Sequence, residues 1–238
     1  WLKPIITSAP ITLKRVIAER KQNPGQYDDL VTILLTTQLK DGTFLPEEQI
    51  VTIFMGLLFA GHETTAGQAA WLIALLLQNA EYRALVQTEI REKVAYGVQI
   101  DAGVLHGLDH LYWAIDETTR LRPSADTQIR TVTTPTQIGA YEIPAGWRIM
   151  VSAATSHMKG DVFANPDQFD PLRYAPERAE GKNPFAIVGF GGGIHKCTGM
   201  NFAKNEMAII TALLFQQFDL ELLSREIHVV TGNGANHP

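Results

Sequence analysis

A glycine-rich stretch at 190–199 contains the only cysteine of the chain, Cys197, and leads directly into an apolar helical pattern. A lone cysteine excludes a disulfide within the chain. Backbone N–H groups at a helix start favour negative charge, so a thiolate is expected to be favoured at this position. Glycines let the backbone turn tightly and approach a flat partner closely. The residues therefore predict a loop that presents one thiolate, which suits one axial bond to haem iron.

The same residues bear on other interpretations of this loop. A phosphate-binding loop requires a Gly-Lys-Ser/Thr triplet before its helix, and the chain contains none. A thiol phosphatase requires an arginine shortly after the cysteine, and Ala203 and its neighbours supply none. A buried structural cysteine beside a turn stays open as an alternative.

The stretch resembles the haem-binding loop of the cytochrome P-450 superfamily, in which Phe, Gly, Arg, Cys and Gly recur at set intervals. Phe190, Gly193, Cys197 and Gly199 match, and His195 stands where arginine is usual, as in the sterol-demethylase branch. The resemblance implies that Cys197 ligates the iron and that His195 meets a haem propionate. It assigns cofactor binding in this loop to Phe190, Gly191, His195, Cys197 and Gly199.

Length and composition describe a soluble globular chain. Of its 238 residues 45% are hydrophobic, and its mean hydropathy is −0.02. The formal charge of −5 argues against a nucleic-acid binder. The chain begins in mid-pattern at Trp1, which predicts a fragment of a longer fold.

Two short helices are predicted near the N-terminus. Residues 11–20 are amphipathic, and Asn23-Pro24-Gly25 should end that helix. A second helix should begin at Asp28 as N-cap and run through Leu35. Asp41-Gly42 then predicts a turn.

From Pro46 to about Gln78 the pattern predicts the longest helix, with Glu47 and Glu48 in its first turn. A membrane span is the alternative, because the flanking runs are apolar. The polar residues 61–65 would then lie at mid-bilayer. We therefore favour a helix through the middle of a helical domain, with this polar interruption facing an internal site.

Residues 60–65, Ala-Gly-His-Glu-Thr-Thr, resemble the oxygen-binding stretch on the long central helix of the same superfamily. Gly61 would permit close approach to the haem, and Thr64 can bond the carbonyl one turn back, opening the helix locally. Glu63 and Thr64 together can relay protons. The resemblance implies catalytic roles for Gly61, Glu63 and Thr64, a cofactor contact for Ala60, and a substrate pocket that includes Phe59 and Ala60.

The next segment is predicted to form a surface helix at 81–93, and a loop is predicted at 105–110. His106 and His110 have the spacing of a metal pair, but no third ligand is evident. Asp109 should cap a helix at 111–121, which Pro123 stops.

That helix carries Glu117 and Arg120, an i, i+3 pair that by itself would be an ordinary surface ion pair. The superfamily has Glu-x-x-Arg at about this distance before the cysteine loop, completed by a later arginine. Arg173 matches that arginine. The resemblance implies a structural role for Glu117, Arg120 and Arg173 in haem assembly, with the carboxylate held between two guanidinium forks.

A β-rich stretch follows, with strands predicted at 128–133, 137–143 and 147–152 and a turn at 144–146. By the resemblance, Arg130 is a haem-propionate ligand, and Ser124 and Ile129 border the substrate pocket. After Cys197 an amphipathic helix should pack behind the haem and against the central helix; its apolar positions are Phe202, Met207, Ile210, Leu213 and Leu214.

The predicted fold class is mainly α with a small β portion: a partial cytochrome P-450 fold, in which residues 1–238 form the C-terminal part of one haem-binding domain. The implied function is a monooxygenase with haem b and a cysteine thiolate ligand, acting on O2 and a sterol-, terpenoid- or fatty-acid-like substrate. Electrons would come from a ferredoxin or flavoprotein reductase, for which Lys196 and Lys204 could form a docking face. The missing N-terminal part of the fold is a further expected partner.

Two alternatives remain. One is a haem-thiolate enzyme of another kind, a peroxygenase, isomerase or dehydratase, for which the Glu63-Thr64 pair has little use. The other is a catalytically silent truncated chain. The sterol-demethylase branch usually lacks a glutamate at the position of Glu63, so the substrate class stays open.

Overall fold

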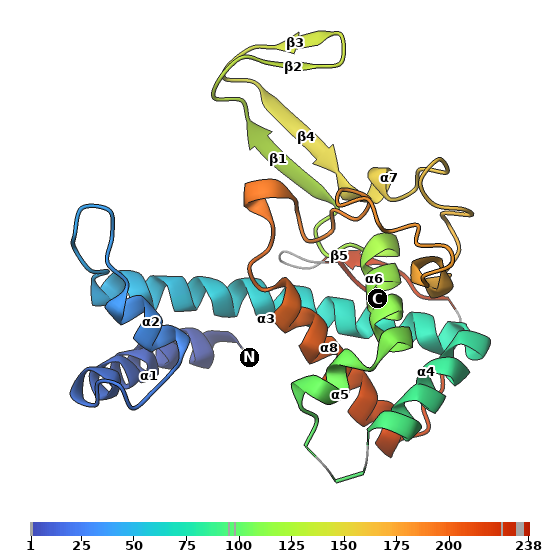
Figure 1. Cartoon of the computed structure of the whole chain (residues 1–238), viewed down its shortest axis with the longest axis horizontal. Coiled ribbons are helices and arrows are strands. Elements are labelled where there is room, and N and C mark those ends of the chain that lie inside the picture. Colours follow the sequence, from blue (N-terminus) through green and yellow to red (C-terminus); the bar gives the residue numbers. More distant parts are fainter. Residues whose placement is uncertain (1, 95, 98, 225, 232–235) are drawn as a thin grey trace. The chain divides into compact units, whose positions relative to one another are not determined.

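The computed structural model describes residues 2–94, 96–97, 99–224, 226–231 and 236–238 (Figure 1). Its residues form two compact units, Trp1–His62 and Glu63–Pro238. The fold is mostly helical with short antiparallel strand pairs, as the sequence predicts.

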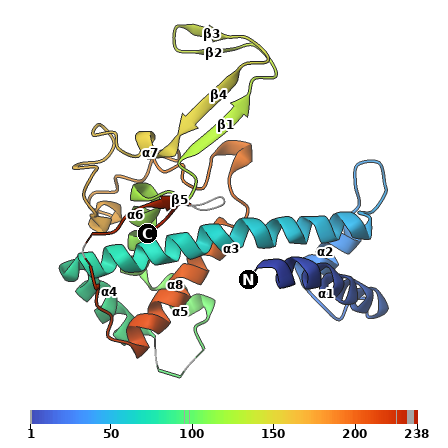
Figure 2. The same cartoon turned by 180° about the vertical axis from the view of Figure 1, so that it is seen from behind.

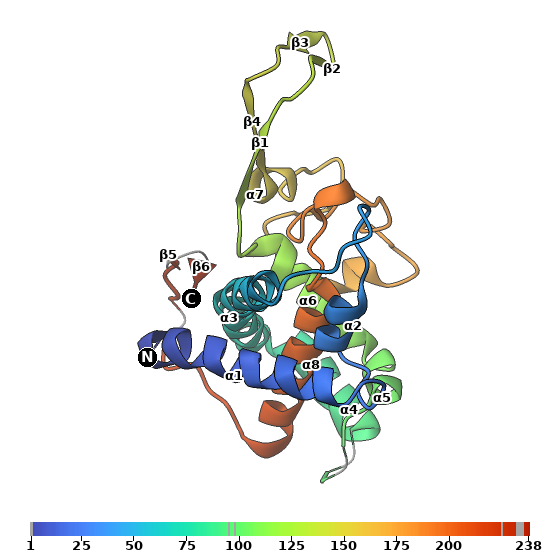
Figure 3. The same ribbon diagram turned by 90° about the vertical axis from the view of Figure 1, so that its left-hand side faces the viewer.

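The first unit contains α1 (Leu2–Gln22), α2 (Leu30–Thr36) and the start of α3 (Glu47–Gln78), around a small core of Ile17, Val31, Ile50 and Val51. Figure 3 shows α1 and α2 side by side. The predicted stop at 23–25 is confirmed, and α1 extends further toward the N-terminus than the predicted 11–20. The N-cap of α2 is Asp29 and not the predicted Asp28. The side chain of Asp29 accepts a hydrogen bond from the N–H of Thr32 at 2.9 Å.

Helix α3 begins directly after Pro46 and ends at Gln78, as predicted, and it is helical without interruption through 61–65. In the part of the chain that the structure describes, α3 alone has the length and composition of a membrane-crossing helix. Central helices of soluble proteins meet the same criterion, so this finding does not favour a span.

The core of the second unit is built where the C-terminal part of α3, α4 (Ala80–Lys93), α6 (Asp109–Leu121) and α8 (Met200–Gln217) meet. Figure 2 shows these four helices together with α5 (Ala102–His106). Leu72, Val86, Leu111 and Ala208, one from each of the four, are completely buried there. This cluster fixes the position of α6, which carries Glu117 and Arg120.

Two sequence predictions in this region were wrong. Residues 105–110 are not a loop, because α5 ends at His106 and α6 begins at Asp109. Asp109 is therefore the first residue of α6 and not its cap. The predicted surface helix is confirmed as α4: most of its residues are exposed or partly buried, and one face packs against α6 and α8.

The buried side of α8 also differs from the prediction. Met207 is buried as expected, but it is joined by the smaller residues Ala208, Thr211 and Ala212. Phe202, Ile210 and Leu213 are exposed in this chain. Small side chains let α8 approach its neighbours closely, which a pattern of large apolar residues does not reveal.

The strands form ribbons rather than a layered sheet. Strand β1 (Thr127–Thr131) pairs with β4 (Arg148–Ser152) in an antiparallel register that sets Ile129 opposite Met150. The region predicted as one strand at 137–143 is a hairpin, β2 (Thr136–Ile138) and β3 (Tyr141–Ile143), because Gly139 turns the chain with a φ of 58°. Figure 3 shows this hairpin at the tip of the β1–β4 ribbon.

The remaining elements are short. Helix α7 spans Ala153–Ser156, and the 3-10 turns η1 and η2 span Pro171–Tyr174 and Gly193–His195. A last pair, β5 (Val230–Thr231) and β6 (Asn236–His237), lies near the C-terminus.

Candidate functional site: the cysteine loop and its buried ionic support

The cysteine loop is closed by backbone hydrogen bonds that leave its thiol on the surface. The N–H of Cys197 donates to the carbonyl of Phe190 at 2.8 Å, and the N–H of Gly191 donates to Val188 at 2.8 Å. Cys197 is exposed and forms no disulfide. The alternative of a buried structural cysteine is therefore wrong.

Two glycines of the loop have positive φ, Gly191 at 76° and Gly193 at 59°. At Gly191 the reason is also steric, because a Cβ there would lie 2.5 Å from the carbonyl oxygen of His195. A side chain at this position would push the two arms of the loop apart. At Gly193 a Cβ would meet no atom within 4 Å, so only the backbone conformation favours glycine.

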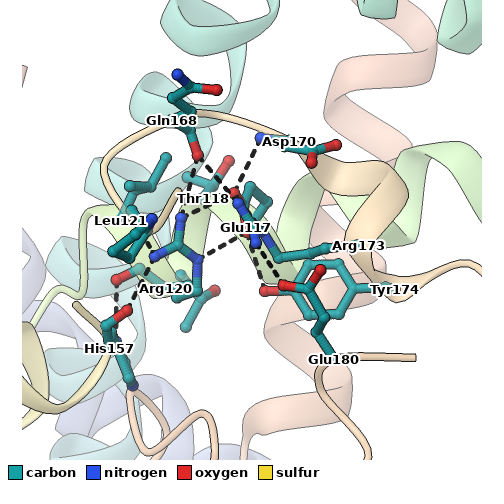
Figure 4. A network of polar contacts seen from close by, with 12 residues as sticks. Glu117, Thr118, Arg120, Leu121, His157, Gln168, Asp170, Arg173, Tyr174 and Glu180 are labelled. Carbon is teal, nitrogen blue, oxygen red and sulfur yellow. Dashed lines mark hydrogen bonds and ion pairs between the residues drawn. The ribbon is translucent and has the colours of Figure 1, made fainter. Parts of the chain in front are cut away.

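Glu117, Arg120 and Arg173 come together as the sequence predicts, and all three side chains are completely buried (Figure 4). Arg120 makes a two-pronged ion pair with Glu117, its Nε and Nη2 each 2.9 Å from a carboxylate oxygen. The Nε of Arg173 donates to the same carboxylate at 3.0 Å. Such a carboxylate is stable without water only because donors occupy both its oxygens.

Sequence reasoning missed other members of this cluster. The Tyr174 hydroxyl donates to Glu117 Oε2 at 3.0 Å, and the backbone N–H of Asp170 donates to Oε1 at 2.9 Å. Glu180 pairs with Arg173 at 2.6 Å. Figure 4 shows these side chains around the Glu117 carboxylate. Their contribution depends on how the segment 164–180 folds back on α6, which no local spacing indicates.

Burial and the charges of the cluster shift the pKa values of Tyr174 and Arg173. Burial and then the negative charge of Glu117 raise the pKa of Tyr174 far above its usual range, so its phenol stays protonated. Burial acts to lower the pKa of Arg173, but Glu117 and Glu180 outweigh it and the net shift is upward. Tyr174 and Arg173 therefore keep their protons across the physiological pH range.

Another link joins α3 to the end of α6. Gln68 on α3 is buried; its Nε2 donates to the carbonyl of Arg122, and its Oε1 accepts from the Thr119 hydroxyl at 3.3 Å. Ser124 Oγ donates to the backbone carbonyl of Thr64 at 3.2 Å. The structure therefore brings one expected substrate residue, Ser124, against one expected catalytic residue, Thr64.

Other expected site residues are exposed or only partly buried in the described chain. His195 is exposed, and Ile129 is 58% exposed on β1. The guanidinium of Arg130 bonds within its own strand, to the carbonyl of Ile129 and to Gln128 Oε1 at 3.1 Å. Glu63 is half-buried at the start of the second unit.

In the first unit, the expected site residues Phe59, Ala60 and Gly61 are all exposed on α3.

The structure does not support the histidine pair as a metal site. His106 is exposed at the end of α5, whereas the ring of His110 packs edge-on against Tyr82 and Trp113, with ring centroids 6.0 and 5.2 Å away. Among the described residues no three histidine, cysteine or acidic side chains form a group that could hold a metal ion.

The residues around Cys197 fit a haem group. An exposed thiol is a soft ligand suited to haem iron. Large apolar side chains of the same region are also exposed, namely Phe185 at 65%, Ile194 at 96% and Phe202 at 74%, and such surface is rarely left to water. The ring of Phe185 lies close to Gly192, where an added Cβ would be 3.3 Å away.

Comparison with known proteins agrees with the fold and the motifs. The family model "Cytochrome P450" matches residues 9–231. Cytochrome P450 120 of Synechocystis is 32% identical over 212 residues, which is 89% of this chain and 48% of that protein. Sterol 14-demethylase of Arabidopsis thaliana is 31% identical over 218 residues, 88% of this chain and 45% of that protein.

A solved structure, retinoic acid bound cyanobacterial CYP120A1, superimposes with a TM-score of 0.85 at 29% identity. It covers 98% of this chain, and this chain covers 53% of it. The chain thus spans about half the length of the relatives it matches. With the family model matching nearly all of its residues, the chain belongs to the cytochrome P450 family.

Proposed function

We propose that this chain is the C-terminal part of one haem-thiolate monooxygenase domain, over residues 1–238, with haem b ligated by Cys197. The reaction is insertion of one oxygen atom of O2 into a lipophilic substrate, with electrons from a ferredoxin or flavoprotein reductase. The chain spans half of its relatives, so the rest of the fold is itself an expected partner.

The observation that carries this proposal is the exposed thiol of Cys197 on a closed loop. The 2.8 Å bond from its N–H to Phe190 fixes the base of the loop, and Gly191 admits no side chain. A thiolate held by the backbone in this way is pre-organised as a ligand. Family membership adds independent support.

When bound, haem supplies the oxygen activation, and this chain supplies the ligand, the protons and the surroundings. The thiolate of Cys197 would hold the haem iron as an electron-rich ligand. The carboxylate of Glu63 and the hydroxyl of Thr64, adjacent on α3, would hold and pass protons beside it. The bond from Ser124 to the Thr64 carbonyl ties that point of α3 to the segment after α6.

A lipophilic substrate is supported by exposed apolar side chains in each unit, Phe59 in the first and Ile129 in the second. His195 in the cysteine loop and the relative named as a sterol 14-demethylase favour a sterol or terpenoid. Retinoic acid in the cyanobacterial structure is a further apolar ligand of a relative. His195 and Arg130 are the proposed haem-propionate contacts.

The docking face for the electron donor rests on Lys196, which is exposed. Lys204 is a weaker candidate than its charge indicates, because its ammonium pairs with Asp116 and its side chain is 18% exposed. Reversing the charge of Lys196 should slow reduction by an acidic donor.

The test is reduction of the haem-loaded protein with dithionite followed by carbon monoxide. We expect the far-red-shifted Soret band of a thiolate-ligated carbonyl. The band should vanish in Cys197→Ala and persist in Thr198→Ala, a change of the exposed neighbour. A band at the position of neutral ligation in the unmodified chain would contradict the thiolate assignment and the proposed reaction with it.

A further inference from the structure

His157 is a completely buried histidine that bonds to two separate segments. Its Nδ1 lies 2.9 Å from the backbone carbonyl of Arg120, as Figure 4 shows. Its Nε2 lies 2.9 Å from the backbone nitrogen of Val188. The Val188 N–H can only donate, so Nε2 accepts, and the ring proton resides on Nδ1, which donates to Arg120. The imidazole is therefore neutral and in one tautomer.

The side chains of His157 and Arg120 each donate a hydrogen bond to the backbone carbonyl of the other residue. Arg120 Nη1 donates to the backbone carbonyl of His157 at 2.9 Å, while the same guanidinium holds Glu117. The histidine is therefore hydrogen-bonded directly to a member of the buried ionic cluster. The charged groups facing it are Arg120 and Glu117, which are paired with each other.

Val188 is the point where the cysteine loop starts. Its carbonyl accepts from Gly191 N–H at 2.8 Å and from Gln128 Nε2 at 3.1 Å, while its N–H is held by His157. Gly189, the next residue, presses against α6, since a Cβ there would lie 2.6 Å from Thr119 Cγ2. The root of the loop therefore has no room to move toward α6, and the imidazole bond to the Val188 N–H holds it in place.

We propose that His157 is a positioning residue that transmits the rigidity of the Glu117–Arg120–Arg173 cluster to the cysteine loop through the Val188 N–H. His157 does not touch Cys197; it acts through the loop root, whose Gly191 bond closes the turn before the thiol. The consequence for haem ligation rests on the proposed function, but the loop geometry does not.

A pair of isosteric variants separates the two bonds. In His157→Asn, the side-chain NH2 occupies the place of Nδ1 and keeps the bond to Arg120, while the acceptor for Val188 is lost. In His157→Gln, the side-chain carbonyl reaches the place of Nε2 and keeps the acceptor for Val188. Amide hydrogen exchange in the haem-free 238-residue chain reads out the Val188 and Cys197 N–H groups.

We expect the Val188 amide to exchange roughly five- to tenfold faster in His157→Asn than in His157→Gln, the effect of about one hydrogen bond. The Cys197 amide should follow it in direction. The unmodified chain should give the nitrogen NMR signature of an imidazole protonated on Nδ1. His106→Asn and His106→Gln, at an exposed histidine, are the matched controls and should leave both amides unchanged.

Equal exchange in the two His157 variants would overturn the proposal, because a side chain that merely fills the core does not distinguish them. A ring protonated on Nε2 would overturn it as well. The measurement is made without haem, so failure of the carbonyl test leaves it standing, and its own failure leaves the thiolate assignment untouched.

Discussion

Glu89 on α4 holds the N-terminus of α6 through Leu111. Its Oε2 accepts the Leu111 N–H at 3.0 Å, and its Oε1 accepts the His110 N–H at 3.0 Å, with only 4% of the residue exposed. These N–H groups lack partners within their own helix, so a carboxylate from a neighbouring helix replaces a local cap. Glu89 thereby fixes the start of the helix that ends in the buried ionic cluster.

Replacing this carboxylate should destabilise the second unit. Glu89→Ala leaves two buried N–H groups without acceptors, which costs about 1–3 kcal/mol in the free energy of unfolding. Glu92→Ala, on the exposed side of the same helix, is the matched control and should change it by less than about 0.5 kcal/mol. Urea unfolding followed by circular dichroism measures both. Equal losses would show that Glu89 does not act as a cap.

Replacing each of the two arginines of the 164–180 segment should lower the free energy of unfolding by very different amounts. Arg173→Gln leaves Glu117 without one of its guanidinium partners in the interior, an effect of about 3–5 kcal/mol. Arg178→Gln removes ion pairs of a side chain that is 38% exposed, and should cost about 0–1 kcal/mol. The comparison is made by urea unfolding at one pH. A loss in Arg173→Gln as small as that in Arg178→Gln would mean that the cluster is not a structural support.

Substitutions of the two loop glycines, Gly191 and Gly193, form a matched pair that tests the geometry of the cysteine loop. Gly191→Ala adds a clash at 2.5 Å to the strain of a positive φ, whereas Gly193→Ala adds strain alone, about 1–2 kcal/mol. We therefore expect Gly191→Ala to lose the protection of the Cys197 amide against hydrogen exchange, and Gly193→Ala to retain most of it. The reverse order would contradict the closed loop described above.

Stability should depend on pH through His157. Burial is the main cause that lowers the pKa of this imidazole below its ordinary value of about 6.5. The unfolded chain then binds a proton more readily than the folded one, so the free energy of unfolding is at its full value above about pH 6.5 and falls as the pH decreases. Melting temperatures at pH 7.5, 6.5 and 5.5 should reveal this fall.

The fall should be reduced in His157→Gln, which has no titrating group, and retained in the control His106→Gln. An unchanged pH profile in His157→Gln would assign the dependence to another group.

The local features of this protein and the identity of its motifs can be predicted from the amino-acid sequence alone. The bounds of α3 follow from Pro46, the acidic first turn and the apolar run, and the lone cysteine among glycines is recognisable without any structure. The pairing of Glu117 with Arg120 is also local, because residues three apart share a helix face.

Which buried polar groups bond to one another over long sequence separations depends on how the elements pack in three dimensions. The Glu89 cap, the Tyr174 contact with Glu117, and the His157 bridge to Val188 join residues from 21 to 57 positions apart. For the same reason the buried face of α8 joins Met207 with three small residues and leaves Phe202, Ile210 and Leu213 exposed. Buried polar groups must find partners wherever packing brings them, and periodicity along one element carries no information about that.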